Sequence, residues 1–311
     1  MAALAEGGCA GRNREHTMSQ TSEAMQPVYL ESLVARMSGW SDPEARLRDA
    51  FAEDEFMLLG QSIVPLNSKK QMPFRLELLV RLREEELNLT PPGAFFPALE
   101  ACGMMAMLDR WVVARAAAWW QEKGGIANTV LHVNLAPETL EEEDFASYVL
   151  SEARECGLPP AALCFELPVS DVASASPGFL ACAERLKAAG CGLAVTGFAR
   201  DSFSLDALRM TGAPIVKVDG SMVRTVSDDP DAFYRVRSIH RLCGKAGVVT
   251  IAEFVERPET LSKLREIGLD YVQGYGIAKP EPLAEGPIAH RSEVPPQTLS
   301  HEERQRLRAQ P

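Results

Sequence analysis

The sequence predicts an α/β fold that closes into an eight-stranded (β/α)8 barrel of the TIM type. Short apolar runs, typical of strands, alternate with longer amphipathic stretches whose 3.6-residue spacing is typical of helices. So many alternations indicate a parallel sheet with helices outside it, and eight strand candidates favour closure of that sheet. An open doubly wound sheet is the alternative, but no glycine-rich phosphate loop follows the first strand, which weakens it.

The elements follow one another along the chain in the order that such a barrel requires. The predicted strands occupy residues 56–64, 74–82, 129–135, 162–167, 192–198, 214–219, 248–253 and 271–275. The predicted helices occupy residues 92–104, 107–123, 144–157, 178–190, 202–212, 232–247 and 256–268. Glycine closes several of these helices, because a residue without a side chain adopts the left-handed cap most easily: Gly157, Gly190, Gly247 and Gly268.

Length and composition predict one barrel-sized domain between two tails. The 311 residues are 46% hydrophobic and 24% charged, as in an ordinary globular protein. We expect a disordered lead-in at 1–27, a barrel domain with an N-terminal helical segment at 28–285, and a C-terminal tail at 286–311. The net charge of −11 argues against a broad binding surface for duplex nucleic acid, although a local basic cluster can still bind one small anion.

Cysteine spacing and hydropathy bear on the cellular compartment. The seven cysteines are scattered without paired spacing, and most lie in apolar patterns where a thiol behaves as a small hydrophobic group. No run of 18 apolar residues occurs, and the first residues lack the apolar core of a signal peptide. We therefore expect a cytoplasmic protein with reduced thiols and no membrane span.

Polar residues end several of the otherwise apolar strands. Asn134, Glu166 and Glu253 each stand at such an end, and Lys217 lies inside another strand. Barrel enzymes build their sites from the carboxyl ends of their strands, so these side chains are expected to converge on one mouth. Taken singly, each carboxylate is more often a capping or ion-pairing group than a ligand, but a buried lysine needs a partner.

Several separate motifs carry a resemblance to one family. The motifs contain Glu77, Asn134, Glu166, Lys217, Glu253, Glu256 and Gln273. Their order and spacing resemble the EAL domain, a family of phosphodiesterases that hydrolyse the bacterial messenger cyclic di-GMP. The resemblance runs from about Leu47 to about Pro282 and implies a TIM-like barrel of EAL type.

Two family residues are missing at one strand end. Where the family has adjacent aspartates, this chain has Thr196 and Gly197. Lys217 lies 21 positions after Thr196, and the segment from Phe198 to Val218 fits the family pattern without an insertion. The resemblance implies a first metal held by Glu77, Asn134, Glu166 and the first aspartate. It implies a second metal held by the aspartate pair, with the Glu253 position helping through water.

Hard cations such as Mg²⁺ and Mn²⁺ prefer carboxylate and amide oxygens, and two such ions commonly activate water for phosphodiester hydrolysis. A neutral hydroxyl and a residue without a side chain do not replace two charged ligands. We therefore expect no complete catalytic set and no certain cofactor. At most a single residual metal site remains at Glu77, Asn134 and Glu166, and Mg²⁺ or Mn²⁺ matters only if that site is active.

The following loop departs from the family as well. Val169 replaces a glutamate that anchors this loop in the family, and Ala199 and Asp201 replace its usual glycines. These departures argue against the family's catalytic geometry and against dimerisation coupled to this loop, but they do not exclude a dimer.

The remaining family positions are sufficient to line a nucleotide pocket. Arg81 suits a phosphate because its planar fork donates two parallel hydrogen bonds. By resemblance, the expected ligand-binding residues are Gln61, Glu77, Leu79, Arg81, Asn134, Lys217, Glu253, Glu256, Gln273 and Pro280. The histidines, among them His132 and His240, show no zinc spacing and are expected to be packing or surface residues.

The leading hypothesis is a catalytically inactive EAL-like domain that acts as a cyclic di-GMP receptor or as a protein-interaction module in signalling. One alternative is a metal-dependent phosphodiesterase that recruits Asp201 or Asp219 into a rebuilt second site, or works with one metal. Another is a scaffold that binds no nucleotide and docks a protein partner through helices near Trp111 or Leu205.

Overall fold

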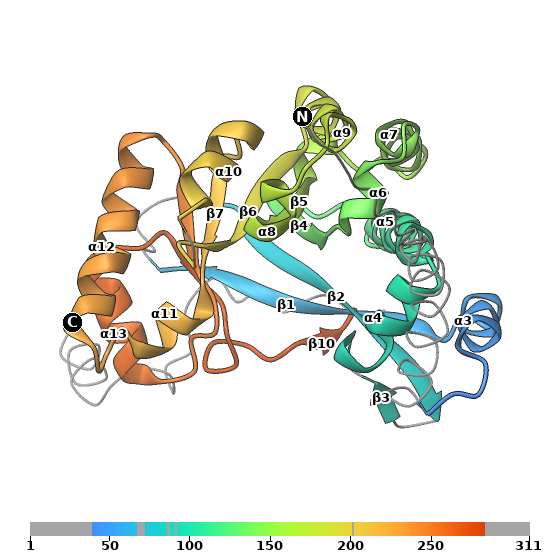
Figure 1. Cartoon of the computed structure of the whole chain (residues 1–311), viewed down its shortest axis with the longest axis horizontal. Helices are drawn as coiled ribbons and strands as arrows, with labels where there is room; N and C mark the ends of the chain where they lie inside the picture. The colour runs from blue at the N-terminus through green and yellow to red at the C-terminus, as the bar shows by residue number, and fades with distance from the viewer. Residues whose placement is uncertain (1–38, 67–71, 86–87, 91, 201, 284–311) are drawn as a thin grey trace, which may run out of the picture.

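The computed structural model describes residues 39–66, 72–85, 88–90, 92–200 and 202–283. The expected lead-in at 1–27 and tail at 286–311 lie outside these residues, and so does Asp201. Within the described residues the strands close into a barrel, with α12 and α13 on one side of it and α5 and α7 on the other (Figure 1).

Each predicted strand overlaps a strand of the barrel, which confirms the predicted fold class. The eight barrel strands are β1 (Phe56–Pro65), β2 (Phe74–Glu85), β4 (Thr129–Asn134), β5 (Leu163–Pro168), β6 (Gly192–Phe198), β7 (Ile215–Val218), β8 (Val249–Ala252) and β9 (Tyr271–Val272). Two short strands extend the sheet: β3 (Asn88–Thr90) pairs with β2, and β10 (Glu281–Pro282) pairs with β1.

The direction of β1 corrects the expectation of a wholly parallel sheet. β1 runs antiparallel to both β2 and β9, while every pairing from β2 through β4 to β9 is parallel. A parallel crossover needs a dozen or more residues, usually with a helix. Only residues 66–73 separate β1 from β2, so the two strands form a hairpin.

The seven predicted helices are all present, as α4 (Pro92–Ala101), α5 (Met105–Glu122), α7 (Phe145–Glu155), α9 (Pro177–Ala188), α10 (Ser204–Thr211), α12 (Pro230–Lys245) and α13 (Pro258–Ile267). α3 (Pro43–Ala52) precedes β1, where the sequence predicted an N-terminal helical segment. The structure adds α6 (Pro137–Leu140), η1 (Pro160–Ala162), α8 (Val169–Ala173) and α11 (Gly220–Thr225). The predicted glycine caps are confirmed by φ angles of +67° at Gly157, +100° at Gly190, +71° at Gly247 and +91° at Gly268.

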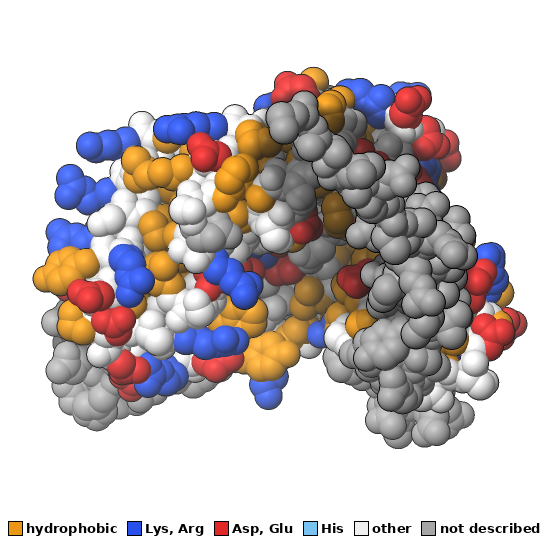
Figure 2. All heavy atoms as spheres, in the orientation of Figure 1, with side chains coloured by type: hydrophobic (Ala, Val, Ile, Leu, Met, Phe, Trp, Pro, Cys, Tyr) orange, Lys and Arg blue, Asp and Glu red, His pale blue; other side chains and the backbone are white. Residues whose placement is uncertain are grey.

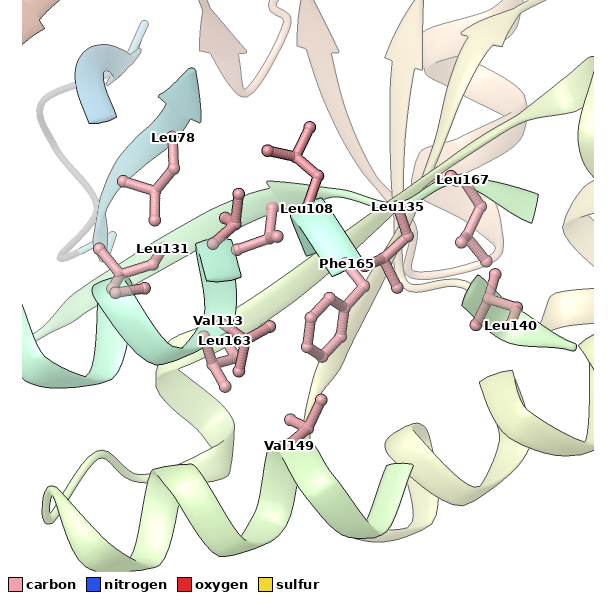
Figure 3. Packing of buried hydrophobic residues seen from close by; sticks show 14 of the residues in the cluster. Leu78, Leu108, Val113, Leu131, Leu135, Leu140, Val149, Leu163, Phe165 and Leu167 are labelled. Atoms are coloured by element: carbon pink, nitrogen blue, oxygen red, sulfur yellow. The ribbon is translucent and has the colours of Figure 1, made fainter. Parts of the chain in front are cut away.

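The main core lies between the barrel wall and the outer helices. Leu131 and Phe165 point outward from β4 and β5, toward Val113 of α5 and Val149 of α7 (Figure 3). Trp119 and Trp120 on α5 are buried in this core. The strands are thereby held in register, so that their inward side chains meet on the barrel axis.

Mainly apolar side chains fill the barrel interior on the side of the amino ends of the parallel strands, which we call the floor of the barrel. Ile63, Cys164, Ala194, Ile215, Ile251 and Tyr271 form one buried cluster there. The cysteines in the described part of the chain are free thiols, in line with the expectation of reduced thiols. Above this apolar layer the interior becomes polar, and the candidate site begins.

Candidate functional site at the barrel mouth

The polar side chains predicted at strand ends meet around one buried lysine. Lys217 on β7 is fully buried, and its Nζ lies 2.6 Å from Glu166 Oε1 on β5. The same Nζ lies 2.8 Å from Glu77 Oε2 on β2 and 3.6 Å from Glu253 Oε1, just after β8. Asn134 on β4 stands beside Glu166 in the strand register. Parallel strands therefore bring residues from five parts of the sequence into one cluster.

Glu77 is the most strongly hydrogen-bonded carboxylate of this cluster. Its Oε1 accepts from Asn134 Nδ2 at 3.0 Å, and its Oε2 accepts from Lys217 Nζ at 2.8 Å and from Gln273 Nε2 at 2.5 Å. Burial alone would raise the pKa of Glu77, but the Lys217 charge and these hydrogen bonds lower it to about 2. Glu77 is therefore the fixed anion of the site.

The other two carboxylates compete for the same ammonium. Burial and the charge of Glu77 raise the pKa of Glu166 to about 8, although Lys217 opposes the shift. Burial also raises the pKa of Glu253 to about 7, again against the effect of Lys217. One ammonium cannot keep three neighbouring buried carboxylates ionised, so protons are retained on Glu166 and Glu253.

A second polar pair lies beneath Glu166. His132 on β4 is fully buried, and its Nδ1 is 2.8 Å from Glu166 Oε1 while its Nε2 is 3.0 Å from Arg75 Nη1. A guanidinium only donates, so His132 Nε2 accepts and Nδ1 donates to Glu166. Burial and the charges of Arg75 and Lys217 hold the pKa of His132 well below its ordinary value.

His132 was predicted to be a packing or surface residue, but it also links Arg75 to Glu166 by hydrogen bonds. Strand alternation was the available signal, since it places His132 on the inward face with Asn134 and Arg75 on the inward face with Glu77.

The end of β6 offers no carboxylate to this cluster. Thr196 lies in register with Pro168 of β5, and the β6–β7 ladder shifts between Val195 and Phe198. Gly197 stands at this irregularity with a φ of +67°, a conformation that glycine adopts without strain. A Cβ added at Gly197 would meet no atom within 4 Å. The site thus has space at this point but no charge.

The residues present do not fit a pair of divalent cations. Glu77 and Glu166 already accept from Lys217, and Glu166 Oε1 also accepts from His132. Among the described residues, no three His, Cys, Asp or Glu side chains are grouped so that they could hold a metal ion. Hard cations need several anionic oxygens directed at one point, and this donor set directs its oxygens at an ammonium.

One cavity opens directly above the cluster. It has a volume of about 380 Å³, and its walls include seven of the predicted ligand-binding residues: Gln61, Glu77, Leu79, Arg81, Glu253, Glu256 and Gln273. Pro280, an eighth predicted residue, also lines it. Asn134 lies outside this list, and Lys217 lies fully buried below. Figure 2 shows acidic and basic side chains around a hollow near the middle of the face in view.

Three side chains that line this cavity were not predicted from the sequence: Arg224, Phe254 and Tyr275. Phe254 is 47% exposed and has a φ of +56°, and the Arg224 guanidinium lies 4.4 Å from its ring centroid. The ring rests on the backbone of Gly220, where an added Cβ would come within 2.1 Å of it. An exposed aromatic face beside an arginine suits a planar base or an anion. A solitary phenylalanine after a strand gave no signal of this kind.

A second cavity adjoins the first on the side of α4 and α5. It has a volume of about 410 Å³ and includes Leu79 and Asn134 in its lining, so Leu79 borders both cavities. Asp109 lies in its wall and accepts from Ala136 N at 2.8 Å and from Thr139 Oγ1 at 2.6 Å. Burial raises the pKa of Asp109 to about 7. The two cavities share Leu79 in their linings and so lie next to each other at this end of β2.

The other positions named in advance have local structural roles. Asp219 accepts from Ser221 N at 3.0 Å and from Ser221 Oγ, and so caps α11. Val169 is buried at the start of α8, and Ala199 has a φ of +70° in the loop after β6. Asp201 is among the residues that the structure does not describe. In the described part of the chain no helix is long and apolar enough to cross a bilayer.

Comparison with known proteins identifies the architecture. The model of the EAL domain family matches residues 44–280. Cyclic di-GMP phosphodiesterase PdeB of Shewanella oneidensis is 29% identical over 248 residues, which cover 77% of this chain and 28% of PdeB. Cyclic di-GMP phosphodiesterase NbdA of Pseudomonas aeruginosa is 30% identical over 82% of this chain and 33% of NbdA. The chain thus spans about a third of the length of these relatives.

Two solved structures show the same fold. The FimX EAL domain of Pseudomonas aeruginosa, bound to cyclic di-GMP, has a TM-score of 0.72 and 24% identity over 81% of this chain and 100% of that domain. The PaMucR phosphodiesterase in complex with cyclic di-GMP has a TM-score of 0.70 and 25% identity over 77% of this chain and 97% of that one. With the family match covering most of the barrel, the chain belongs to the EAL domain family.

Proposed function

We propose that this EAL domain is a receptor that binds cyclic di-GMP without hydrolysing it. The observation that carries the proposal is the combination at the mouth: the Glu77, Lys217 and Gln273 contacts are retained, while β6 ends in Thr196 and Gly197. Binding depends on shape, stacking and hydrogen bonds, whereas hydrolysis of a phosphodiester depends on an activated water and charge neutralisation.

The shape of the mouth supports a dinucleotide ligand. Two neighbouring cavities of about 380 and 410 Å³ share Leu79 in their linings, which supports a ligand with two bases. Arg81, on β2, lines the first cavity, and its planar guanidinium is suited to a phosphate group. Gln273 Oε1 is buried and lacks a hydrogen-bond partner among the described residues, so it suits a donor group on a ligand.

The relatives support the same ligand class. Several are named as cyclic di-GMP phosphodiesterases, and two structural neighbours were solved with cyclic di-GMP bound. These names describe those proteins, and their activity does not carry over to a mouth that lacks the paired acids. A rebuilt second metal site through Asp219 is disfavoured because that carboxylate caps α11.

Isothermal titration with cyclic di-GMP, in EDTA and again in Mg²⁺, tests the proposal. We expect saturable binding of similar affinity in both buffers, and no linear dinucleotide after incubation with Mn²⁺. Arg81→Ala should weaken binding at least tenfold, while Arg83→Ala, an exposed arginine of the same strand outside the cavity, should not. Absence of binding would leave a protein-interaction module, and a linear product that disappears in Glu77→Ala would establish a phosphodiesterase.

A further inference from the structure

A continuous chain of hydrogen bonds runs through the barrel from its floor toward the mouth. At the floor, the Arg75 guanidinium lies 5.1 Å from the centroid of the Tyr271 ring, and Tyr271 donates its hydroxyl to Pro73 O at 3.0 Å. Arg75 Nη1 then donates to His132 Nε2 at 3.0 Å, and His132 Nδ1 donates to Glu166 Oε1 at 2.8 Å. The floor of the barrel is thus linked directly to the carboxylate cluster.

The same chain continues upward to the cavity wall. Glu166 Oε1 accepts from Lys217 Nζ at 2.6 Å, and Lys217 also donates to Glu77 at 2.8 Å. Gln273 Nε2 donates to Glu77 Oε2 at 2.5 Å and to Gln61 Oε1 at 3.0 Å. Gln61 Nε2 finally donates to Ala278 O at 2.9 Å, two residues before Pro280 in the cavity lining.

The buried carboxylates of this hydrogen-bonded network face cations of the protein itself, whereas Arg75 Nε is buried without a partner among the described residues. Arg75 is 8% exposed, His132 and Lys217 are fully buried, and Glu166 is 1% exposed. Buried charges persist only when they are paired and hydrogen-bonded. Lys217 supplies positive charge beside the carboxylates. Arg75 supplies it nearer the floor, where it donates to His132, and His132 in turn donates to Glu166. The interior therefore contains its own counter-ions.

We infer that Arg75 and His132 are positioning residues, which hold Glu166 against Lys217 and so orient Glu77 and Gln273 at the mouth without a divalent cation. This inference rests on the proposed function, because the oriented groups line the nucleotide cavity. A site held rigid in its bound geometry binds more tightly, since less freedom is lost on association.

Two substitutions of the same histidine separate positioning from simple packing. His132→Asn keeps a donor where Nδ1 stands, whereas His132→Leu keeps only the bulk. Both remove the acceptor of Arg75, so they share any loss of stability from that contact. Titration with cyclic di-GMP in EDTA should show binding within about threefold of wild type for His132→Asn and at least tenfold weaker binding for His132→Leu. His240→Leu is the matched control, because His240 bonds Thr250 outside the mouth and should leave the affinity unchanged.

Equal affinities for the Leu and Asn variants would overturn the inference. So would a tenfold loss of wild-type affinity in EDTA relative to Mg²⁺, because the mouth would then depend on a cation.

A second measurement needs no ligand. Nitrogen-15 NMR of the wild-type imidazoles, assigned by the loss of one signal set in His132→Asn, reports which ring nitrogen carries the proton. The inference predicts a neutral His132 with its proton on Nδ1. A proton on Nε2, or a charged ring, would refute it even if cyclic di-GMP does not bind, and absence of binding alone would refute only the proposed function.

Discussion

At the scale of single residues, Lys217 decides how the mouth is charged. Its ammonium is fully buried and faces three carboxylates, and Glu77 retains its charge because Asn134 and Gln273 also donate to it. The sequence predicted that a lysine inside an apolar strand needs a partner, and the structure supplies Glu77 and Glu166. The Arg75–His132 pair was not predicted, because a motif reading treats each histidine separately and gives no cross-strand distance.

Lys217→Met should be strongly destabilising, because it leaves the Glu77 carboxylate buried without its ammonium partner and removes a donor to Glu166. Removal of one partner of a buried pair costs about 3–5 kcal/mol, and chemical denaturation at pH 7 should show a loss of this size. Lys263→Met is the control, since its partner Glu266 lies on the surface of α13 and the pair is worth less than about 1 kcal/mol. A Lys217→Met protein as stable as wild type would contradict the electrostatic role given to this lysine.

Asp109 should make stability depend on pH. Burial raises its pKa to about 7 in the folded state, against hydrogen bonds from Thr139 and Ala136 that lower it. A raised folded-state pKa means that the contribution is fully present below about pH 4 and is lost as the pH rises through 7.

Between pH 5 and pH 8 the wild-type protein should therefore lose on the order of 2 kcal/mol through this group, in addition to losses at Glu166 and Glu253. Asp109→Asn should flatten the profile by that amount in urea denaturation, because Asn cannot ionise and still accepts both hydrogen bonds. Asp206→Asn, on the exposed face of α10, should leave the profile unchanged. Parallel profiles for Asp109→Asn and wild type would argue against a protonated Asp109.

At the scale of elements, the sequence predicted all eight barrel strands and the seven longer helices that follow β2, because hydrophobic period and glycine caps are local signals. The antiparallel direction of β1 was not predicted, because the spacing of apolar residues does not tell the direction in which a strand runs. The short link before Phe74 was the signal that could have shown it. The Phe254 ring rests on Gly220 and lies beside Arg224, an arrangement that we call the Phe254 platform. The sequence did not predict it, because α11 and the loop after β8 come together only in the folded protein.

Gly220→Ala should damage this platform. The new Cβ would lie 2.1 Å from Phe254 Cδ2, so the ring must leave its place under Arg224 and beside the cavity. Overpacking of this kind costs about 1–3 kcal/mol of stability. Titration should show at least tenfold weaker cyclic di-GMP binding.

Gly244→Ala is the matched control for this substitution. Gly244 lies in α12 with no atom within 4 Å of an added Cβ, so alanine should raise stability by about 1 kcal/mol and leave binding unchanged. An unchanged affinity in Gly220→Ala would remove Phe254 from the binding surface.

At the scale of the whole molecule, barrel closure brings strand ends from Glu77 to Gln273 around one axis, and two neighbouring cavities open at this end of the barrel. The sequence identified most residues of the first cavity, because they match motifs of the family that the chain belongs to. The second cavity depends on how α4 and α5 stand against β2, which no motif records. The absence of the acids at Thr196 and Gly197 was visible in the sequence alone, and the structure adds the open space beside Gly197.

The central claim is that this mouth retains cyclic di-GMP and leaves it intact. Equilibrium dialysis of labelled cyclic di-GMP against the protein in Mg²⁺ and Mn²⁺, followed by chromatography of the nucleotide in both chambers, tests it most directly. We expect an excess of labelled nucleotide in the chamber with the protein, and we expect all of this nucleotide to be intact cyclic di-GMP. Linear dinucleotide accumulating beyond one equivalent, or label shared equally between the chambers, would contradict it.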